Sequence, residues 1–498
     1  MTTIETTRAE PSAPTEHNPH HARRWLILGV IALAQLAVVL DATIVNIALP
    51  SAQHSLGFSN DNRQWIITAY ALAFGSLLLL GGRLGDLFGR KPMFITGLIG
   101  FAAASALGGA AGSFGVLVAA RGLQGIFGAL LAPAALSLLS VTFTDLKERG
   151  RAFAIYGAVS GGGGAIGLIL GGALTEYLSW RWCLYVNVPV AVVAVIGAML
   201  LLKKQPKAAH APTLDVPGTI AIVAGLVSLV YGLATAETRG WSSVVTLGYI
   251  GAGVVLIAVF AWLETRAKHP LLPLRILLDR TRGGSFLAVG IVGGGMFGVF
   301  LFLTYYLSTA LDYSPLKTGV SFLPMIVGIT ITAQGSAPVV NRIGVKVPVT
   351  VGMLLATCGM LLFTQLELTS TYWAHIFPGL VIVGLGIGLV IAPAISTATQ
   401  GVQDDDAGVA SAAVNTFQQI GGSISTAVLS AFAAAAATDY MQGKVPNQTN
   451  AAMAALNSYT TAFWWSAGIF AGGAVICGLV LRHGAVEKDP NAVPVMAH

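Results

Sequence analysis

Two charged side chains lie inside apolar stretches, where ionisable groups are rare. Asp41 lies deep in the stretch 25–50, and Arg121 lies in the stretch 115–141. A carboxylate costs free energy in hydrocarbon, so we expect Asp41 to face a bundle interior or a water-filled cavity. Because burial disfavours the ionised form, such a group is able to take up and release a proton. The alternative is a structural acid with a fixed partner.

Arg121 shares one face of its predicted helix with three polar or small residues spaced three, four and seven positions on: Gln124, Gly125 and Gly128. Arginine stays charged in proteins, so it can bind an anion or hold a nearby carboxylate ionised. The internal repeat described below aligns Arg121 with Val381, so the fold does not require arginine in both halves. We therefore predict that Asp41 and Arg121 both serve function rather than packing.

A short charged segment from Gly82 to Lys91 joins two apolar stretches, and it holds three cations, one acid and three glycines. Such a hairpin cannot lie in hydrocarbon, so it must turn at a membrane surface. Its cations indicate the cytoplasmic surface. An ordinary positively charged loop is the simpler interpretation. The residues alone therefore predict a turn at the cytoplasmic surface.

A stripe of glycines follows in the stretch 152–175. Gly163, Gly167 and Gly171 recur every four residues, and Gly172 adjoins them. Small residues at this spacing let two helices approach closely in a membrane. Our further hypothesis is that the stripe sets the closeness of a moving interface.

Other polar and aromatic side chains inside apolar stretches are candidates to line a substrate cavity. Each of them also suits an ordinary role in packing or hydrogen bonding. The candidates are Asn46, Gln124, Tyr305, Tyr306, Gln334, Asn415, Gln418 and Gln419, with Trp464 as a further aromatic candidate.

The composition is that of a membrane protein with many spans. Of the 498 residues 55% are hydrophobic and only 10% are charged, whereas soluble domains carry roughly 25% charge. Because a span needs about 20 apolar residues, we expect an all-α membrane protein with fourteen spans. They are 25–50, 63–82, 92–112, 115–141, 152–175, 183–202, 216–235, 244–263, 284–308, 318–340, 347–366, 375–396, 409–436 and 458–481.

The distribution of cations predicts the orientation. With both termini inside, 21 of the 27 Lys and Arg residues fall in inner segments and 5 in outer segments. This excess predicts cytoplasmic termini and multiple passes through the cell membrane. Orientation explains the net charge of +6 better than nucleic-acid binding does. The spans hold no paired catalytic carboxylates, no metal-spaced His/Cys cluster and no phosphate-binding loop, so we expect no enzyme activity, metal or cofactor.

The chain contains an internal repeat. The segment 86–91 matches 341–346, and 128–134 matches 388–394, at similar offsets and in the same membrane direction. Parallel halves related by an axis along the membrane normal are typical of transporters. We predict two pseudo-symmetric six-helix bundles with two extra central helices. The divisions are a disordered tail 1–24, a bundle 25–202, an insertion 203–283 with a linker, two spans and an interfacial segment, a second bundle 284–482 and a tail 483–498.

Several motifs resemble those of the major facilitator superfamily. The segment 82–91 resembles its signature loop, 121–125 its second motif and 163–172 its antiporter motif, although Leu168 stands where proline is usual. Residues 40–50, 180–189, 270–272 and 415–423 resemble the fourteen-span drug:proton antiporters, although Gln418 stands where arginine is frequent.

This resemblance implies alternating access by rocking of the two halves. It implies a cytoplasmic gate formed by Gly82, Asp86, Gly89, Arg90 and Lys91. In the outward-facing state Asp86 and Arg90 would latch the halves together on the cytoplasmic side. Asp41 would bind a proton from outside and lose it inside, with Arg121 tuning its affinity. The proton gradient would drive export of amphipathic drugs or antibiotics.

Two other functions agree with the same residues. A proton-coupled importer of a small organic solute would use the same fold and Asp41, and a membrane sensor would not transport. The expected partners are an amphipathic small molecule, protons and the lipid bilayer, and we expect the monomer to be functional.

Overall fold

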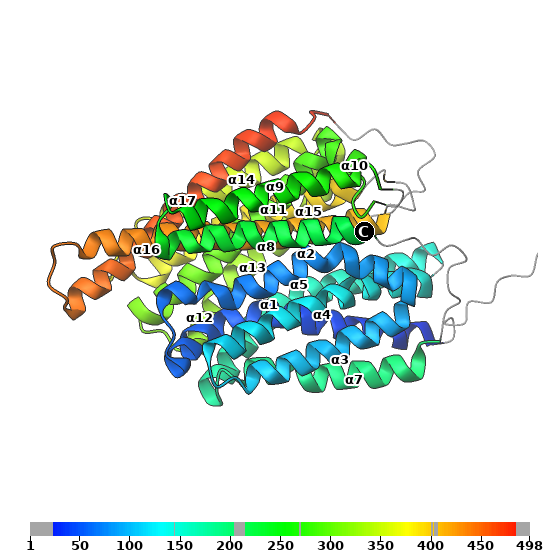
Figure 1. Cartoon of the computed structure of the whole chain (residues 1–498), viewed down its shortest axis with the longest axis horizontal. Coiled ribbons are helices and arrows are strands. Elements are labelled where there is room, and N and C mark those ends of the chain that lie inside the picture. Colours follow the sequence, from blue (N-terminus) through cyan, green and yellow to red (C-terminus); the bar gives the residue numbers. More distant parts are fainter. Residues whose placement is uncertain are drawn as a thin grey trace, which may run out of the picture.

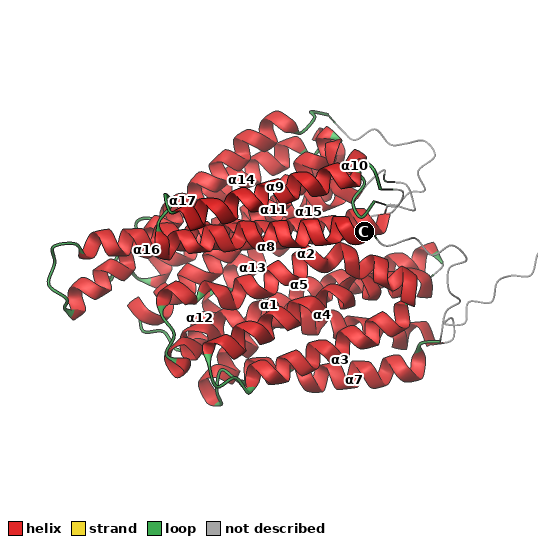
Figure 2. Cartoon of the chain, in the orientation of Figure 1, coloured by secondary structure: helices red, strands yellow, loops and turns green. Residues whose placement is uncertain are grey.

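The computed structural model of the chain describes residues 23–143, 145–203, 215–267, 270–399, 402 and 407–484. Within this part the secondary structure is helical, as Figure 2 shows. Fourteen helical segments of the described chain are long and apolar enough to cross a membrane. They coincide one by one with the fourteen predicted spans, so the fold class is confirmed.

The first six spans form one bundle, the N-half, which lies in the lower part of Figure 1. A one-turn helix, α6 (Trp182–Tyr185), precedes the last of them. The N-half consists of α1 (Arg24–Leu56), α2 (Gln64–Phe88), α3 (Arg90–Gly109), α4 (Phe114–Thr142), α5 (Leu146–Tyr177) and α7 (Asn187–Leu201).

The last six spans form the C-half, in the upper part of Figure 1. Two short π-helical segments, η3 (Tyr306–Ala310) and η4 (Tyr372–Ile376), adjoin its helices. The C-half consists of α11 (Arg280–Tyr305), α12 (Pro315–Ser321) continued by α13 (Leu323–Ile343), α14 (Lys346–Phe363), α15 (Phe377–Thr399), α16 (Ala407–Met441) and α17 (Gln448–Val480).

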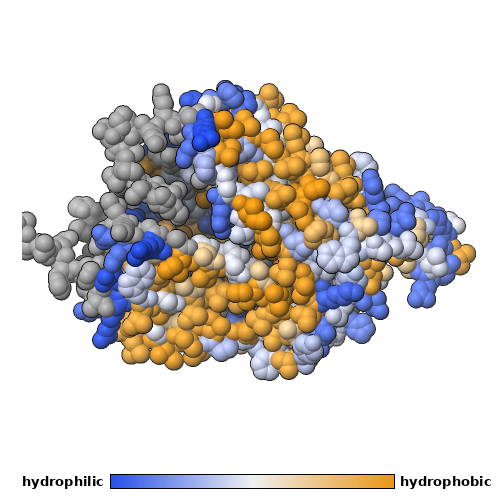
Figure 3. All heavy atoms as spheres, turned by 180° about the vertical axis from the view of Figure 1, so that it is seen from behind, coloured by the Kyte–Doolittle hydropathy of each residue, from blue (hydrophilic) through white to orange (hydrophobic). Residues whose placement is uncertain are grey.

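The two inserted spans, α8 (Val216–Arg239) and α9 (Val244–Glu264), pack across the seam between the halves. Leu226 and Val230 of α8 form an apolar cluster with Leu72 of α2 and with Ile420 and Ile424 of α16. The inserted pair therefore contacts both halves. Figure 3 shows an apolar band of surface between more polar ends, as expected for a protein that crosses a bilayer.

The repeat is visible in the backbone. Gly89 ends α2 with φ of 97°, and Gly344 ends α13 with φ of 81°. Positive φ favours glycine over residues with a Cβ atom. Both turns are therefore made the same way, 255 residues apart. Because the number of spans is even, both ends of the described chain lie on one side, here called the termini side; the opposite side is the far side.

The insertion continues from α9 into a five-residue helix, α10 (Leu274–Leu278). We expected an apolar segment at the membrane interface over 265–282. The structure instead buries Leu271, Leu272 and Ile276 against the protein core, whereas Leu278 is exposed. The segment is thus mainly a packed connection between the insertion and the helices around it.

Candidate functional site

Asp41 and Arg121 form an ion pair in the middle of the N-half. The Arg121 Nη1 atom lies 2.5 Å from the Asp41 Oδ2 atom. The two side chains are 0% and 2% exposed. Because two charges removed from water need good geometry and further hydrogen bonds to be stable, the groups around this pair decide its properties.

Three neutral polar residues complete the environment of the carboxylate. Gln124 Nε2 donates to Asp41 Oδ1 at 2.7 Å, and Asn187 Nδ2 donates to the same oxygen at 2.9 Å. Gln124 also donates to the Ser105 hydroxyl at 2.8 Å. Residues from α1, α3, α4 and α7 thus meet at one carboxylate. Three donors, from Arg121, Gln124 and Asn187, are thus directed at this carboxylate.

Further contacts on α2 and α4 fix the guanidinium of Arg121. Its Nε donates to the Ile66 carbonyl oxygen at 3.1 Å, and Nη1 also donates to Gln124 Oε1 at 2.8 Å. The guanidinium carbon lies 4.4 Å from the centre of the Tyr70 ring, a cation–π contact. The Tyr70 hydroxyl and the side-chain carbonyl oxygen of Asn187 are buried without a hydrogen-bond partner among the described residues.

Glycines on α4 bring α2 close enough for these contacts. A Cβ atom at Gly125 would lie 2.5 Å from the Tyr70 carbonyl oxygen, and one at Gly128 would lie 2.9 Å from the Phe74 ring. Neither distance is tolerated by a real side chain. One face of α4 therefore has two roles. Arg121 and Gln124 make the polar contacts of the site, and Gly125 and Gly128 let α2 pack closely against it.

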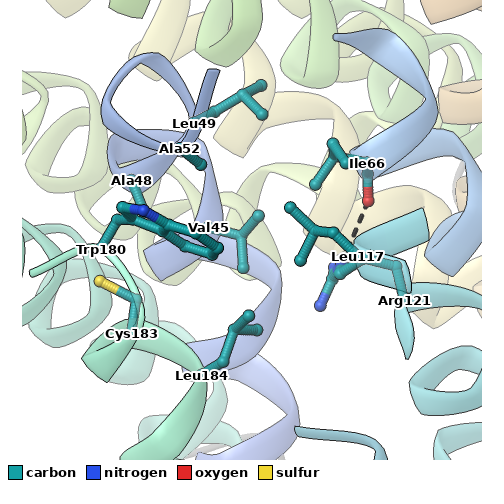
Figure 4. Close-up of a pocket in the computed structure, with 10 residues that line it drawn as sticks. All are labelled: Val45, Ala48, Leu49, Ala52, Ile66, Leu117, Arg121, Trp180, Cys183 and Leu184. Atoms are coloured by element: carbon teal, nitrogen blue, oxygen red, sulfur yellow. Dashed lines mark hydrogen bonds between the residues drawn. The ribbon is translucent and has the colours of Figure 1, made fainter. Parts of the chain in front are cut away.

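A small cavity adjoins the pair, on the side of α1 that faces Trp180. Figure 4 shows the end of the Arg121 side chain pointing toward it. The other lining groups are apolar or thiol side chains: Val45, Ala48, Leu49, Ala52, Ile66, Leu117, Trp180, Cys183 and Leu184. The ion pair is thus separated from solvent by apolar side chains.

The glycine stripe of α5 packs against the part of α1 that carries Asp41. A Cβ atom at Gly163 would lie 3.1 Å from Val39, and one at Gly171 would lie 2.8 Å from Ile44. A Cβ atom at Gly167 would overlap the Thr43 hydroxyl. The stripe therefore makes a close interface within the N-half.

Gly172 faces the C-half instead. A Cβ atom there would lie 2.5 Å from the Leu316 Cα atom of α12, and Glu176 accepts a hydrogen bond from the Leu316 amide at 3.0 Å. Leu168, which replaces the usual proline, is buried, and its carbonyl oxygen contacts Gly319. The far-side end of α5 is therefore packed on the C-half.

Two further contacts hold the halves together on the far side. The Tyr305 hydroxyl of α11 donates to Gln53 Oε1 of α1 at 2.5 Å. Arg63, just before α2, stacks on the Tyr305 ring with its guanidinium carbon 4.3 Å from the ring centre. The two halves therefore meet at α1, α2, α5, α11 and α12 on this side.

The termini-side part of α5 is uncovered. Gly157 and Gly161 lie on the helix face that continues from Leu168 and Gly172, and they are exposed with no atom near a built Cβ. The side chain of Gln334 on α13 is also exposed. The face of α5 that packs on the C-half at the far side thus loses that cover toward the termini side.

The predicted gate loop makes contacts within the N-half and with the insertion. Lys91 Nζ donates to the Leu202 carbonyl oxygen at the end of α7, and Gly82 lies against Pro133 of α4. Gly89 forms the turn, and Arg90 begins α3 half-buried. The backbone of Asp86 belongs to α2, but its side chain lies outside the described residues.

A neighbouring residue, Arg83, binds the insertion. Its Nη2 donates to the Pro270 carbonyl oxygen at 2.7 Å. The next two residues, Leu271 and Leu272, donate their backbone N–H groups to the buried Glu264 carboxylate at 3.2 Å and 3.0 Å. Pro270–Leu272 is therefore held from two sides, by α2 and by the end of α9.

The predicted cavity residues are dispersed. Tyr305 belongs to the far-side contact, whereas Tyr306 is buried inside the C-half and donates to the Glu367 carbonyl oxygen at 2.6 Å. Asn46 is buried on α1, with its side-chain carbonyl lacking a partner among the described residues. Trp464 is exposed on the outer surface of α17.

Three candidates lie along α16. Asn415 donates to the Ser411 carbonyl oxygen at 3.3 Å within the helix. The backbone of Gln418 packs against Gly293 of α11. Gln419 lies at the seam with α2, where a Cβ atom at Gly75 would approach its side chain to 2.9 Å. Gln124 belongs to the ion-pair network.

Sequence and structure comparisons identify the family. The model described as Major Facilitator Superfamily matches residues 31–426. The puromycin resistance protein pur8 of Streptomyces alboniger is 47% identical over 475 residues, which cover 94% of each chain. The tetracenomycin C resistance and export protein of Streptomyces glaucescens is 34% identical, with 88% of this chain and 81% of the relative covered.

Solved structures share the fold at low identity. An auto-inhibited peptide transporter of the POT family matches 95% of this chain and 99% of its own, with a TM-score of 0.67 at 15% identity. A bacterial homologue of the human lysosomal transporter Spinster, inward-facing and unoccupied, matches 94% and 97% with a TM-score of 0.58 at 15% identity. The chain therefore belongs to the major facilitator superfamily.

Proposed function

We propose that the protein exports amphipathic antibiotics in exchange for protons by alternating access, from a cell membrane in which both termini are cytoplasmic. The observation that carries this proposal is the sealed Asp41–Arg121 pair. Because a buried carboxylate in a membrane bundle is costly, its presence points to a role in ion or proton movement. Relatives named for antibiotic resistance and export give the substrate class.

Asp41 carries the proton, and Arg121 competes with that proton for the carboxylate. Protonation of Asp41 removes the charge that holds Arg121 Nη1 and turns one acceptor oxygen into a donor. The network with Gln124 and Asn187 must then rearrange. Breaking a buried pair costs about 3–5 kcal/mol when one charge stays uncompensated. This cost makes proton uptake a switch between two arrangements.

With cytoplasmic termini, as proposed, the contacts between the halves support assignment of this arrangement to an inward-facing state. Glu176, Gln53 and Arg63 hold the far side closed, whereas the termini-side face of α5 at Gly157 and Gly161 is open. In this state the antibiotic enters from the cytoplasm while Asp41 is ionised. Proton uptake from outside then accompanies release on the far side, and the latch of Asp86 and Arg90 closes the cytoplasmic side.

The driving force is sufficient for useful export. A membrane potential of 100 mV supplies about 2.3 kcal/mol per charge. Each unit of pH difference adds about 1.4 kcal/mol. One proton per neutral substrate can therefore sustain a concentration ratio of roughly 10² to 10³.

Transport of puromycin by purified protein in proteoliposomes with an imposed pH gradient tests the proposal. We expect the parent to exchange puromycin for protons, and Asp41→Asn to lose proton-driven exchange while remaining folded. The matched control is Asp439→Asn, which removes an acid from the far-side end of α16 and should transport like the parent. Proton-driven exchange by Asp41→Asn at the parental rate would show that this carboxyl group is not the coupling site.

The direction of transport is tested in cells. Expression in a drug-sensitive strain should give puromycin resistance that disappears when a protonophore collapses the gradient. Increased sensitivity with proton-dependent uptake would establish the importer instead. An unchanged response to every antibiotic tested, together with no exchange in liposomes, would contradict both forms of transport.

A further inference from the structure

A second pocket lies on the far side, between the two halves and away from the Asp41–Arg121 pair. One wall is α1, which contributes Ser51 and His54. The other wall is formed by α11, η3 and α12, which contribute Thr304, Ser308 and Thr318. The space amounts to roughly 870 Å³ when the part open to solvent is included, within the size range of small-molecule sites.

The floor of this pocket holds unpaired hydroxyl groups. Thr304 and Thr318 are each 1% exposed. Their hydroxyl oxygens lack a hydrogen-bond partner among the described residues. An unpaired buried hydroxyl costs about 1–3 kcal/mol. Both oxygens have almost no accessible surface, so an occupant reaches them only when the groups that cover them move aside, and its hydrogen bonds then remove this cost.

The lining selects against charged occupants. None of the described residues that line the pocket is Asp, Glu, Lys or Arg. Apolar surface is provided by Ile47, Pro50 and the Tyr313 ring. The Lys317 ammonium group makes a cation–π contact with this ring, 3.6 Å from its centre. This combination suits an uncharged ring that presents hydroxyl groups at one end and an apolar face at the other.

The mouth opens to the far side. His54 is exposed near the end of α1, whereas Thr304 and Thr318 lie at the buried end. An occupant would thus enter from outside the cell under the proposed orientation, while the cytoplasmic side is open. It would touch α1 of the N-half and α11 and α12 of the C-half at the same time.

We propose that this pocket binds uncharged, hydroxyl-bearing compounds of the nucleoside or glycoside type from the far side, and that the bound compound holds the far side closed. A ligand that binds one conformation better than the other shifts the equilibrium toward it. The far side must open for export under the proposed function, so occupancy slows export. The site gives the exporter inhibition by external compounds.

Binding is tested on the full chain in lipid nanodiscs, with adenosine as the probe and adenine, which lacks the sugar hydroxyls, as the ligand control. Ser51→Cys provides a thiol at the pocket for a membrane-impermeant maleimide. We expect adenosine, but not adenine, to slow labelling. Equal labelling rates with and without adenosine would overturn the proposal and leave a pocket occupied by water alone.

Substitutions of the floor hydroxyls localise the site. Thr304→Val and Thr318→Val keep the side-chain shape and should each weaken adenosine protection about fivefold, the effect of one lost hydrogen bond of about 1 kcal/mol. Thr309→Val is the matched control, because its hydroxyl already donates to the Tyr305 carbonyl oxygen at 2.6 Å. Equal weakening by all three variants would contradict binding at the floor. Parent-like protection in both floor variants would also contradict it.

The effect on transport is a separate measurement, which rests on the proposed function. Adenosine on the far side of proteoliposomes should slow puromycin exchange by the parent, and higher adenosine concentrations should be needed in Thr304→Val. Protection in the labelling assay without slower exchange would refute closure of the far side. Absence of any puromycin exchange in the parent contradicts the proposed function, whereas the labelling assay still decides the site.

Discussion

The fit between α5 and α1 predicts a strong effect of one methyl group at Gly167. A Cβ atom there overlaps the Thr43 hydroxyl and lies 3.2 Å from the Thr43 Cβ atom and 3.4 Å from the Leu40 carbonyl oxygen. The hydroxyl cannot rotate away freely, because it donates to the Val39 carbonyl oxygen at 3.0 Å. Gly167→Ala therefore forces a new Thr43 rotamer or a separation of the helices.

The magnitude of the effect on stability follows from two costs and one gain. Overpacking of a close interface costs about 1–3 kcal/mol. The loss of one neutral hydrogen bond adds about 1 kcal/mol. Replacing glycine by alanine inside a helix returns about 1 kcal/mol. We expect Gly167→Ala to lower the free energy of unfolding by about 1–3 kcal/mol and to slow proton-driven exchange, because Asp41 lies on the displaced segment of α1.

The neighbouring glycine provides a matched control. A Cβ atom at Gly164 meets only the Thr43 Cγ2 atom, at 4.0 Å, which is an ordinary contact. Gly164→Ala should therefore keep parental stability or gain up to about 1 kcal/mol. Denaturation of the purified protein in detergent measures both variants, and proteoliposome exchange measures their activity. Thr43→Ala should partly restore Gly167→Ala, because it removes the overlapping hydroxyl.

The packing argument is refuted if Gly167→Ala matches Gly164→Ala in both stability and exchange. Failure of Thr43→Ala to restore any stability would place the cost of the added methyl group elsewhere. A stable but slow Gly167→Ala would instead locate the effect in the movement of α1 rather than in folding.

Three further substitutions probe the site and its surroundings. Arg121→Lys keeps the charge but loses the planar fork and the bond to Ile66, so exchange in proteoliposomes should fall at least tenfold; parental exchange would show that charge alone suffices. Tyr305→Phe removes the hydroxyl bound to Gln53. It should raise the rate of maleimide labelling of the Ser51→Cys thiol on the far side by about fivefold. An unchanged labelling rate would show that this hydrogen bond does not hold the halves together. Lys91→Met removes the cation at the end of α7 and should destabilise the folded protein by about 1 kcal/mol in denaturation experiments, with unchanged stability as the contrary result.

The spans were predictable because hydrocarbon imposes a simple rule. A segment of about 20 apolar residues either crosses the bilayer or must be buried, and each predicted span has its helix. The segment near Leu271 and Leu272 was harder. Its leucines suggested an interfacial helix, but Glu264 binds their backbone amides and turns them inward. Nearly every residue has a backbone N–H group, so the sequence does not show which of these groups a carboxylate will bind.

The pair at the centre of the site was predictable for the same physical reason. Asp41 and Arg121 are isolated charges in apolar sequence, and each needs an opposite charge to be stable inside the membrane. Asn187 and Ser105 were not found as members of the site, because neutral polar residues are tolerated in many places inside a bundle. Nothing local marks the 146-residue separation of Asp41 from Asn187, and only the packing of α1 against α7 brings them together.

Adjacent positions on one helix explain the different places of Tyr305 and Tyr306. Successive side chains of a helix point about 100° apart, so Tyr305 at the end of α11 and Tyr306 at the start of η3 point in different directions. Tyr305 reaches Gln53 across the far-side contact, whereas Tyr306 reaches Glu367 inside the C-half. The sequence shows both as aromatic residues near the end of a span. Only the rotation of α11, set by its neighbours, separates their roles.

The two inserted helices are attached differently to the two halves. Toward the N-half, Arg83 of α2 donates to the Pro270 carbonyl oxygen, and Glu264 at the end of α9 holds the next two residues. Toward α16 the cluster contact is made by the apolar side chains of Ile420 and Ile424. Hydrogen bonds fix a geometry, whereas apolar contact is non-directional and tolerates sliding. If the halves rock as proposed, we therefore expect α8 and α9 to move with the N-half, and the displacement to occur at the α8–α16 surface.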